Sequence, residues 1–82
     1  MVKFFGNDST WLEALRSGDE DAFRLLVDRF QDKVFRTCLG LVNDREDADD
    51  LTQEVFIEAF RSIRTFRAES GLSTWLCRIA IN

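Results

Sequence analysis

Hydrophobic residues recur with a helical period along most of the chain. Apolar side chains fall every three or four positions between residues 19 and 43, which predicts one long amphipathic helix. The same spacing predicts helices over residues 10–17, from about residue 45 to 66, and from residue 72 onward. The predicted inward-facing residues of the two long helices are Phe23, Leu26, Val27, Phe30, Val34, Cys38, Leu41 and Val42 in the first, and Ala48, Leu51, Val55, Ala59, Ile63 and Phe66 in the second.

Residues that favour helix ends mark the predicted boundaries. Thr10 and Glu13 have the spacing of a capping box, and Gly18 suits the position just after a helix. Asp19 is expected to cap the long helix, with acidic residues next to it at the positive end of the helix dipole. The remaining predicted N-caps are Asn43 or Asp44 for the third helix and Ser70 for the fourth.

The composition fits a helical domain. The 82 residues contain no Pro and four Gly, and 45% are hydrophobic, which is too apolar for a disordered chain. Short connections between the predicted helices indicate an all-α fold, a compact three- to four-helix bundle formed by one domain, with residues 1–9 as a flexible N-terminus. No apolar stretch approaches the roughly 20 residues that a membrane span needs, and no signal peptide is evident. We therefore expect a cytoplasmic protein without membrane insertion.

The sequence offers little material for catalysis. It has no His and no Gly-rich phosphate loop, and Cys38 and Cys77 lie far apart without metal-ligand spacing. We interpret the two cysteines as small hydrophobic side chains of a reduced core. The prediction is a protein that is not an enzyme, with no catalytic residue, no metal and no cofactor.

Charge is distributed unevenly. Residues 1–60 contain seven Lys or Arg and fourteen Asp or Glu, whereas residues 61–82 contain four Arg and one Glu. The net charge of −4 argues against a general nucleic-acid binder. An acidic body with a basic end suggests two different partners, although an unevenly charged solvated surface explains the asymmetry equally well.

Two stretches of sequence resemble a known family. Residues 47–56, DADDLTQEVF, resemble the D-A-E-D-L-x-Q-E-x-F signature of sigma-factor region 2.2. Residues 66–82, FRAESGLSTWLCRIAIN, are similar to the F-R-x-x-S-x-x-x-T-W-L-x-R-I-A-x-N run of regions 2.3 and 2.4 in extracytoplasmic-function (ECF) sigma factors. Residues 19–42 resemble region 2.1. Both motifs occur in the family's order, about ten residues apart, so the chain is identified as resembling region 2 of a bacterial ECF sigma factor.

The resemblance implies a polymerase-binding face on the third helix. In the family, this face docks on a coiled coil of the RNA polymerase β′ subunit. The residues carried over are Asp47, Asp50, Gln53 and Glu54. Positions 50, 53 and 54 share one side of a helix, and carboxylates there would pair with Arg on the coiled coil. Solvation of the acidic face is the alternative, and Asp47 also suits the helix dipole.

The resemblance also implies contacts with the nontemplate strand of the minus-ten promoter element. The residues carried over are Arg61, Arg64, Phe66, Arg67, Ser70, Arg78 and Asn82. The arginines would hold phosphates of a melted strand, and the amide of Asn82 would read a base edge. Phe66 fits base stacking and the core stripe about equally. Ser70 suits a base contact or, more readily, a helix cap, and Trp75 is assigned to the core.

These features favour a transcription initiation domain that binds core RNA polymerase and melts the minus-ten element. The alternative is a helical interaction module that acts through an anti-sigma factor, without independent DNA binding. A helix-turn-helix repressor fragment is disfavoured because the third helix is acidic. Relative to the family pattern, we expect the chain to end within region 2.4, without the linker and region 4, and to bind promoter DNA weakly alone.

Overall fold

A computed structural model describes residues 9–67 and 71–82 of the chain. Within these residues the fold is all-α, which confirms the predicted three- to four-helix bundle. The elements are α1 (Ser9–Arg16), α2 (Glu20–Val42), α3 (Arg45–Ser62), the 3-10 turn η1 (Ile63–Thr65) and α4 (Leu72–Ile81). None of the helices described is both long and apolar enough to cross a membrane.

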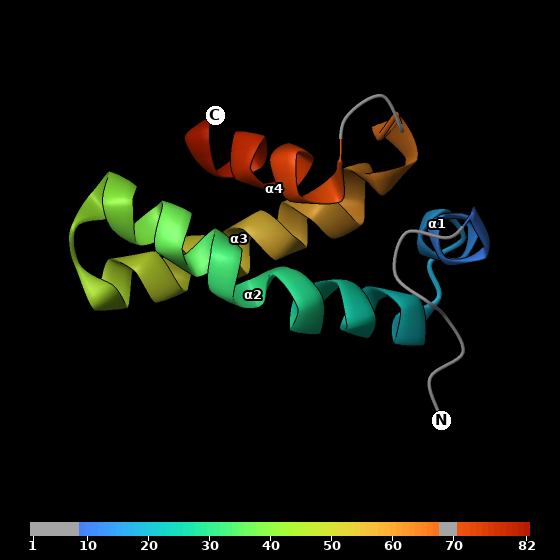
Figure 1. Cartoon of the computed structure of the whole chain (residues 1–82), viewed down its shortest axis with the longest axis horizontal. Coiled ribbons are helices and arrows are strands. Elements are labelled where there is room, and N and C mark those ends of the chain that lie inside the picture. Colours follow the sequence, from blue (N-terminus) through green and yellow to red (C-terminus); the bar gives the residue numbers. More distant parts are fainter. Residues whose placement is uncertain (1–8, 68–70) are drawn as a thin grey trace.

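The helices α2 and α3 form an antiparallel hairpin, and α4 packs against both of them (Figure 1). The short helix α1 lies at the opposite end from the α2–α3 turn, where it contacts α2 and η1. The core therefore lies between α2, α3 and α4, and α1 closes the end at which α3 passes into η1. Its largest fully buried side chains are those of Trp11, Leu26, Val34, Cys38, Val55 and Leu76.

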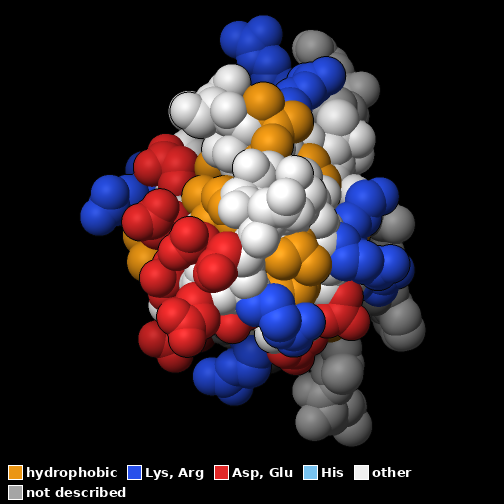
Figure 2. All heavy atoms as spheres, turned by 90° about the vertical axis from the view of Figure 1, so that its left-hand side faces the viewer, with side chains coloured by type: hydrophobic (Ala, Val, Ile, Leu, Met, Phe, Trp, Pro, Cys, Tyr) orange, Lys and Arg blue, Asp and Glu red, His pale blue; other side chains and the backbone are white. Residues whose placement is uncertain are grey.

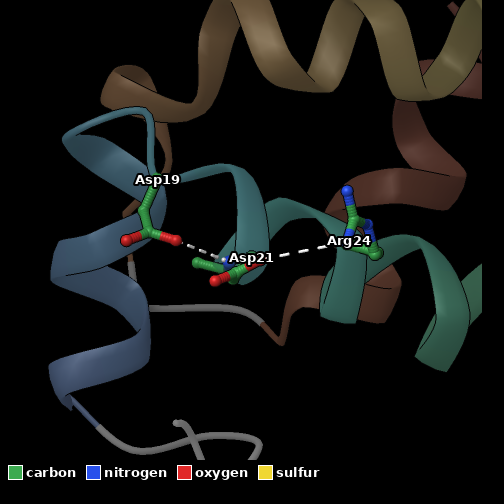
Figure 3. Close-up of polar contacts among 4 residues, drawn as sticks. Asp19, Asp21 and Arg24 are labelled. Atoms are coloured by element: carbon green, nitrogen blue, oxygen red, sulfur yellow. Dashed lines mark hydrogen bonds and ion pairs between the residues drawn. The ribbon is translucent and has the colours of Figure 1, made fainter. Parts of the chain in front are cut away.

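The ends of α2 follow the sequence prediction closely. The Asp19 carboxylate accepts a hydrogen bond of 3.0 Å from the Ala22 N–H, as an N-cap does (Figure 3). In the same part of α2, the exposed side chains of Asp21 and Arg24 form an ion pair with 3.9 Å between Oδ1 and Nη1 (Figure 3), which adds little stability. Asn43 ends the helix in the left-handed conformation, with φ 59°, and Asp44 then caps α3 by accepting a bond from the Asp47 N–H at 3.0 Å.

The start of α1 and the end of α3 differ from the prediction. Helix α1 begins at Ser9, inside the segment expected to be flexible, so Thr10 lies within its first turn and is not the N-cap of a capping box. The predicted N-cap Ser70 lies outside the described residues, and the structure places the N-cap of α4 at Gly71, whose carbonyl accepts the Trp75 N–H. The regular part of α3 ends at Ser62, because the chain tightens there into a 3-10 turn.

Most of the predicted core positions are buried or packed against the core, with informative exceptions. Leu41, in the last turn of α2, is 50% exposed. Thr52, which the periodicity did not mark, is buried, and its hydroxyl is satisfied by donating to the Ala48 carbonyl at 2.7 Å. Cys38 is buried and Cys77 half-buried, and both are free thiols.

Candidate functional site

The four residues predicted to bind a protein lie on the exposed side of α3. We call this set, Asp47, Asp50, Gln53 and Glu54, the acidic face. Burial of Ala48, Val55 and Ala59 on the other side of the helix turns these side chains outward. Acidic side chains gather in a band on the end of the molecule that contains the α2–α3 turn (Figure 2). The arrangement suits a partner surface that is basic and can follow a helix.

Exposed apolar side chains on α3 form a feature that sequence reasoning missed. Ile57 is 54% exposed and Phe60 is 50% exposed. One side of the Phe60 ring is covered by an edge-to-face contact with Phe23, with 5.2 Å between the ring centroids. A groove of about 570 Å³ between α2 and α3 is lined in part by Gln53 and Ile57. The signal was present in the sequence, because positions 57 and 60 are apolar, one turn apart and off the centre of the core stripe. Such side chains favour contact with another protein.

The second predicted site follows the acidic face along the chain. Arg61 lies in the last turn of α3, Arg64 in η1, and Arg67 just after Phe66, and all three side chains are exposed. We call these three arginines the basic edge. Only Arg64 lies in the 3-10 turn itself, and Phe66 has extended backbone with ψ 126°, so the three arginines follow one another from the end of α3 through η1 to the segment after it. The basic edge can hold a polyanion such as a phosphate backbone.

Phe66 lies in the core in this structure. Its side chain is 5% exposed, and its ring centroid is 5.1 Å from that of Trp75 at an interplanar angle of 50°. Trp75 is itself half-buried against the core, where the sequence placed it. Of the two interpretations of Phe66, the core one describes its observed position, and the ring is not available there for stacking on a base.

The remaining candidates lie on α4 or next to its ends. Arg78 and Asn82 are exposed, and the Asn82 N–H closes the helix on the Arg78 carbonyl at 3.0 Å. A groove of about 600 Å³ between α3 and α4 is bordered by Glu54, Arg61 and Asn82, so members of both predicted surfaces meet there. Ser70 lies outside the described residues. Among the residues that are described, no three His, Cys, Asp or Glu side chains converge as metal ligands.

Comparison with known proteins gives consistent matches. Residues 26–82 match the family model described as Sigma-70 region 2. The chain is 48% identical over 75 residues to the ECF RNA polymerase sigma-E factor of Haemophilus influenzae, covering 92% of this chain and 39% of that protein. It is 38% identical over 71 residues to the ECF RNA polymerase sigma factor SigW of Bacillus subtilis, covering 87% of this chain and 38% of that protein. The chain thus spans about two fifths of these relatives.

A solved structure has the same fold. It is the NMR structure of an engineered region 2 of sigmaE in complex with GTAAAA. The match has a TM-score of 0.80 and 37% sequence identity, and it covers 96% of this chain and 84% of the other. The curated relatives are named as sigma factors, which are transcription initiation factors and not enzymes.

Proposed function

Because the chain belongs to the Sigma-70 region 2 family, as a region 2 domain of the ECF type, we propose that it acts in transcription initiation through two surfaces. The acidic face binds the β′ coiled coil of core RNA polymerase. The basic edge, with Arg78 and Asn82, holds the nontemplate strand of the minus-ten promoter element. The observation that carries this proposal is the order of two oppositely charged, exposed sets of side chains along the chain, acidic on the first part of α3 and basic from its last turn through η1 to Arg67.

The chemistry of the acidic face supports polymerase binding. Asp50, Gln53 and Glu54 present two carboxylates and an amide within one helical turn, and Arg side chains bind such groups through short, charge-assisted hydrogen bonds. The exposed side chains of Ile57 and Phe60 add apolar area that a partner helix can cover. Charge then fixes the register, while apolar contact supplies much of the affinity.

The basic edge supports binding of a single strand. Exposed arginines attract phosphates without regard to sequence, so they position the strand but do not read it. Reading requires groups that meet base edges, and the amide of Asn82, which borders the same groove as Arg61, is suited to this because it both donates and accepts. The sigmaE region 2 structure, at 37% identity, is a complex with GTAAAA, which supports a nucleic-acid role for this domain.

A second candidate function uses the acidic face without DNA. An anti-sigma factor that covers the same part of α3 would also bury Ile57 and Phe60. The exposure of these two side chains favours this candidate as an additional role, and the same variants test both partners. The anti-sigma candidate predicts binding in the absence of polymerase and of DNA.

The first experiment is capture of core RNA polymerase, and separately of its isolated β′ coiled coil, by the 82-residue chain and its Asp50→Arg variant. We expect the parent to bind both and the variant to lose at least about tenfold in affinity, because one favourable charge pair becomes a repulsive one. Glu13→Arg is the matched control. It makes the same charge change at an exposed position on α1, away from the acidic face.

The outcomes separate the two partners. Loss of binding in Asp50→Arg with retention in Glu13→Arg would support the acidic face as the docking surface. Equal binding by all three chains would show that the face is wrongly assigned. Absence of binding by a well-folded parent would remove the polymerase proposal and leave the anti-sigma candidate.

A further inference from the structure

Arg16, the last residue of α1, joins two parts of the chain that are far apart in sequence. Its Nη2 donates a hydrogen bond of 2.8 Å to the Phe66 carbonyl, across 50 positions. The contact lies at the end of the molecule where α1 meets η1. None of the residues of the acidic face or the basic edge lies on α1, so neither surface explains this contact.

Helix α1 is held firmly enough to act as a fixed support. Trp11 is fully buried, and its indole N–H donates to the Ala22 carbonyl at 2.9 Å, in the first turn of α2. Leu15 is buried as well. Arg16 therefore extends from a helix that is anchored by packing and by a buried hydrogen bond, and its reach toward Phe66 starts from a defined point.

Phe66 is the point at which the chain leaves η1. Its N–H donates to the Ile63 carbonyl at 3.1 Å, its ring packs on Trp75, and its carbonyl accepts the bond from Arg16. That carbonyl belongs to the same planar peptide unit as the Arg67 N–H. Fixing the carbonyl thus fixes the orientation of the peptide from which Arg67, a member of the basic edge, begins.

The Arg16 guanidinium is not a typical surface cation. The side chain is half-buried, and its Nε is a buried donor with no hydrogen-bond partner in the structure described. Leaving a buried donor unpaired is unfavourable, and a side chain that only filled space would avoid it. The unpaired Nε is explained if arginine is needed at position 16 because its side chain is long enough to reach the Phe66 carbonyl and forms a charge-assisted hydrogen bond there.

We infer that Arg16 is a positioning residue for the DNA-binding end: by bonding to the Phe66 carbonyl, it holds the Phe66–Arg67 backbone in the orientation that binds the strand. This rests on the proposed function, since it deepens the role of the basic edge. Arg16 itself does not contact phosphate in this scheme. It acts through the peptide that it orients.

The test uses the whole 82-residue chain with Arg16→Met, Arg16→Lys and the control Arg36→Met. Arg36 is exposed on α2 and bonds within its own helix, to the Asp32 carbonyl at 3.4 Å. The probe is fluorescein-labelled single-stranded GTAAAA, titrated at several salt concentrations. Exchange of the Phe66 amide hydrogen is followed by NMR, and circular dichroism serves as a control for folding.

We expect Arg16→Met to weaken oligonucleotide binding about tenfold, because one charge-assisted bond is lost. The Phe66 N–H, which donates to the Ile63 carbonyl, should exchange about tenfold faster, since release of the Phe66 carbonyl by Arg16 makes it easier for this end of η1 to open. The dependence of log affinity on log salt should keep its slope, because no phosphate contact is removed. Arg16→Lys should recover part of both effects, and Arg36→Met should behave as the parent.

Three results would overturn the inference. Unchanged oligonucleotide affinity in Arg16→Met, with a parent that binds, would show that the Phe66 anchor has no role in recognition. A salt slope that falls by about 0.7 would mark Arg16 as a direct phosphate ligand. Unchanged exchange of the Phe66 amide would show that the bond does not hold this backbone. A folded parent that binds no oligonucleotide would instead disprove the DNA part of the proposed function.

Discussion

The acidic face and the basic edge follow one another along the chain, yet they are built in different ways. The acidic face lies on regular helix, where hydrogen bonds within α3 and the buried side of that helix set the direction of every side chain. The basic edge spans the last turn of α3, the 3-10 turn η1 and the extended backbone at Phe66. Its shape depends on contacts from α1 and α4, namely Arg16 and Trp75.

The acidic face is expected to be the more robust of the two surfaces. A helix surface persists as long as the helix does, whereas an edge of irregular backbone persists only while its supports remain packed. Changes in the core should therefore disturb the basic edge before the acidic face. Substitutions in the core, in the basic edge itself and at the cap of α3 can test this contrast.

Leu76→Ala should have the largest effect. Leu76 is the fully buried residue of α4, and its truncation should lower the free energy of unfolding by about 3 kcal/mol because it leaves a cavity. Ile81→Ala, at a 64% exposed position on the same helix, should cost less than about 0.5 kcal/mol. Urea unfolding followed by circular dichroism measures both. Similar losses for the two variants would mean that α4 is not anchored through Leu76.

Arg64→Glu combined with Arg67→Glu should weaken binding of single-stranded GTAAAA by about tenfold or more at low salt, since two phosphate-binding charges are reversed. The slope of log affinity against log salt should decrease by about 1.4, or roughly 0.7 for each contact. Binding of the β′ coiled coil should not change. Fluorescence anisotropy measures the first two quantities.

The control for this variant is Arg29→Glu with Arg36→Glu, which makes the same change in net charge on the exposed side of α2. It should lose much less affinity than the double variant at the basic edge. Equal losses in the two double variants would show that overall charge, and not the basic edge, governs binding. Loss of the fold in Arg64→Glu with Arg67→Glu would show that these arginines are structural.

Asp44→Ala should have the smallest effect and separates structural carboxylates from those of the acidic face. Its carboxylate caps α3, so removal should lower the free energy of unfolding by about 1 kcal/mol, while Asp44→Asn should retain most of the stability. Thermal unfolding measures this, and polymerase capture should stay unchanged for both. Asp47→Ala, in the first turn of α3, is the matched variant and should weaken polymerase capture while lowering the free energy of unfolding by less than Asp44→Ala does. Weakened capture by Asp44→Ala would show that Asp44 also belongs to the polymerase-binding surface.

The regular parts of the fold could be predicted from the sequence because local periodicity and capping determine them. The caps at Asp19 and Asp44 and the exposed side of α3 depend on residues within a few positions of one another. The cap predicted at Thr10 failed because neighbouring polar residues could serve equally well, and which of them begins α1 depends on how that helix packs, which no local pattern contains. The cap predicted at Ser70 lies outside the described residues.

In the candidate site too, features set by neighbouring residues could be predicted, whereas features set by contacts between distant segments could not. The exposure of Asp50 and Glu54 follows from helix phase, whereas the burial of Phe66 depends on Trp75 approaching from another helix. The Arg16 bond to the Phe66 carbonyl joins residues 50 positions apart and has no sequence signature. The helical period places Ile57 and Phe60 away from the centre of the buried stripe, but apolar side chains are usually assigned to the core, so their exposure was not predicted.

The unbroken course of α3 has a consequence for how this domain can vary. Its 18 residues span roughly 27 Å, and each residue advances the helix by about 100°. One residue inserted or deleted between Glu54 and Arg61 would rotate the two charged surfaces by that angle relative to each other, with composition almost unchanged. Substitutions can tune either surface separately, but the number of residues between them sets their relative phase, and it is this length that we expect to tolerate the least change.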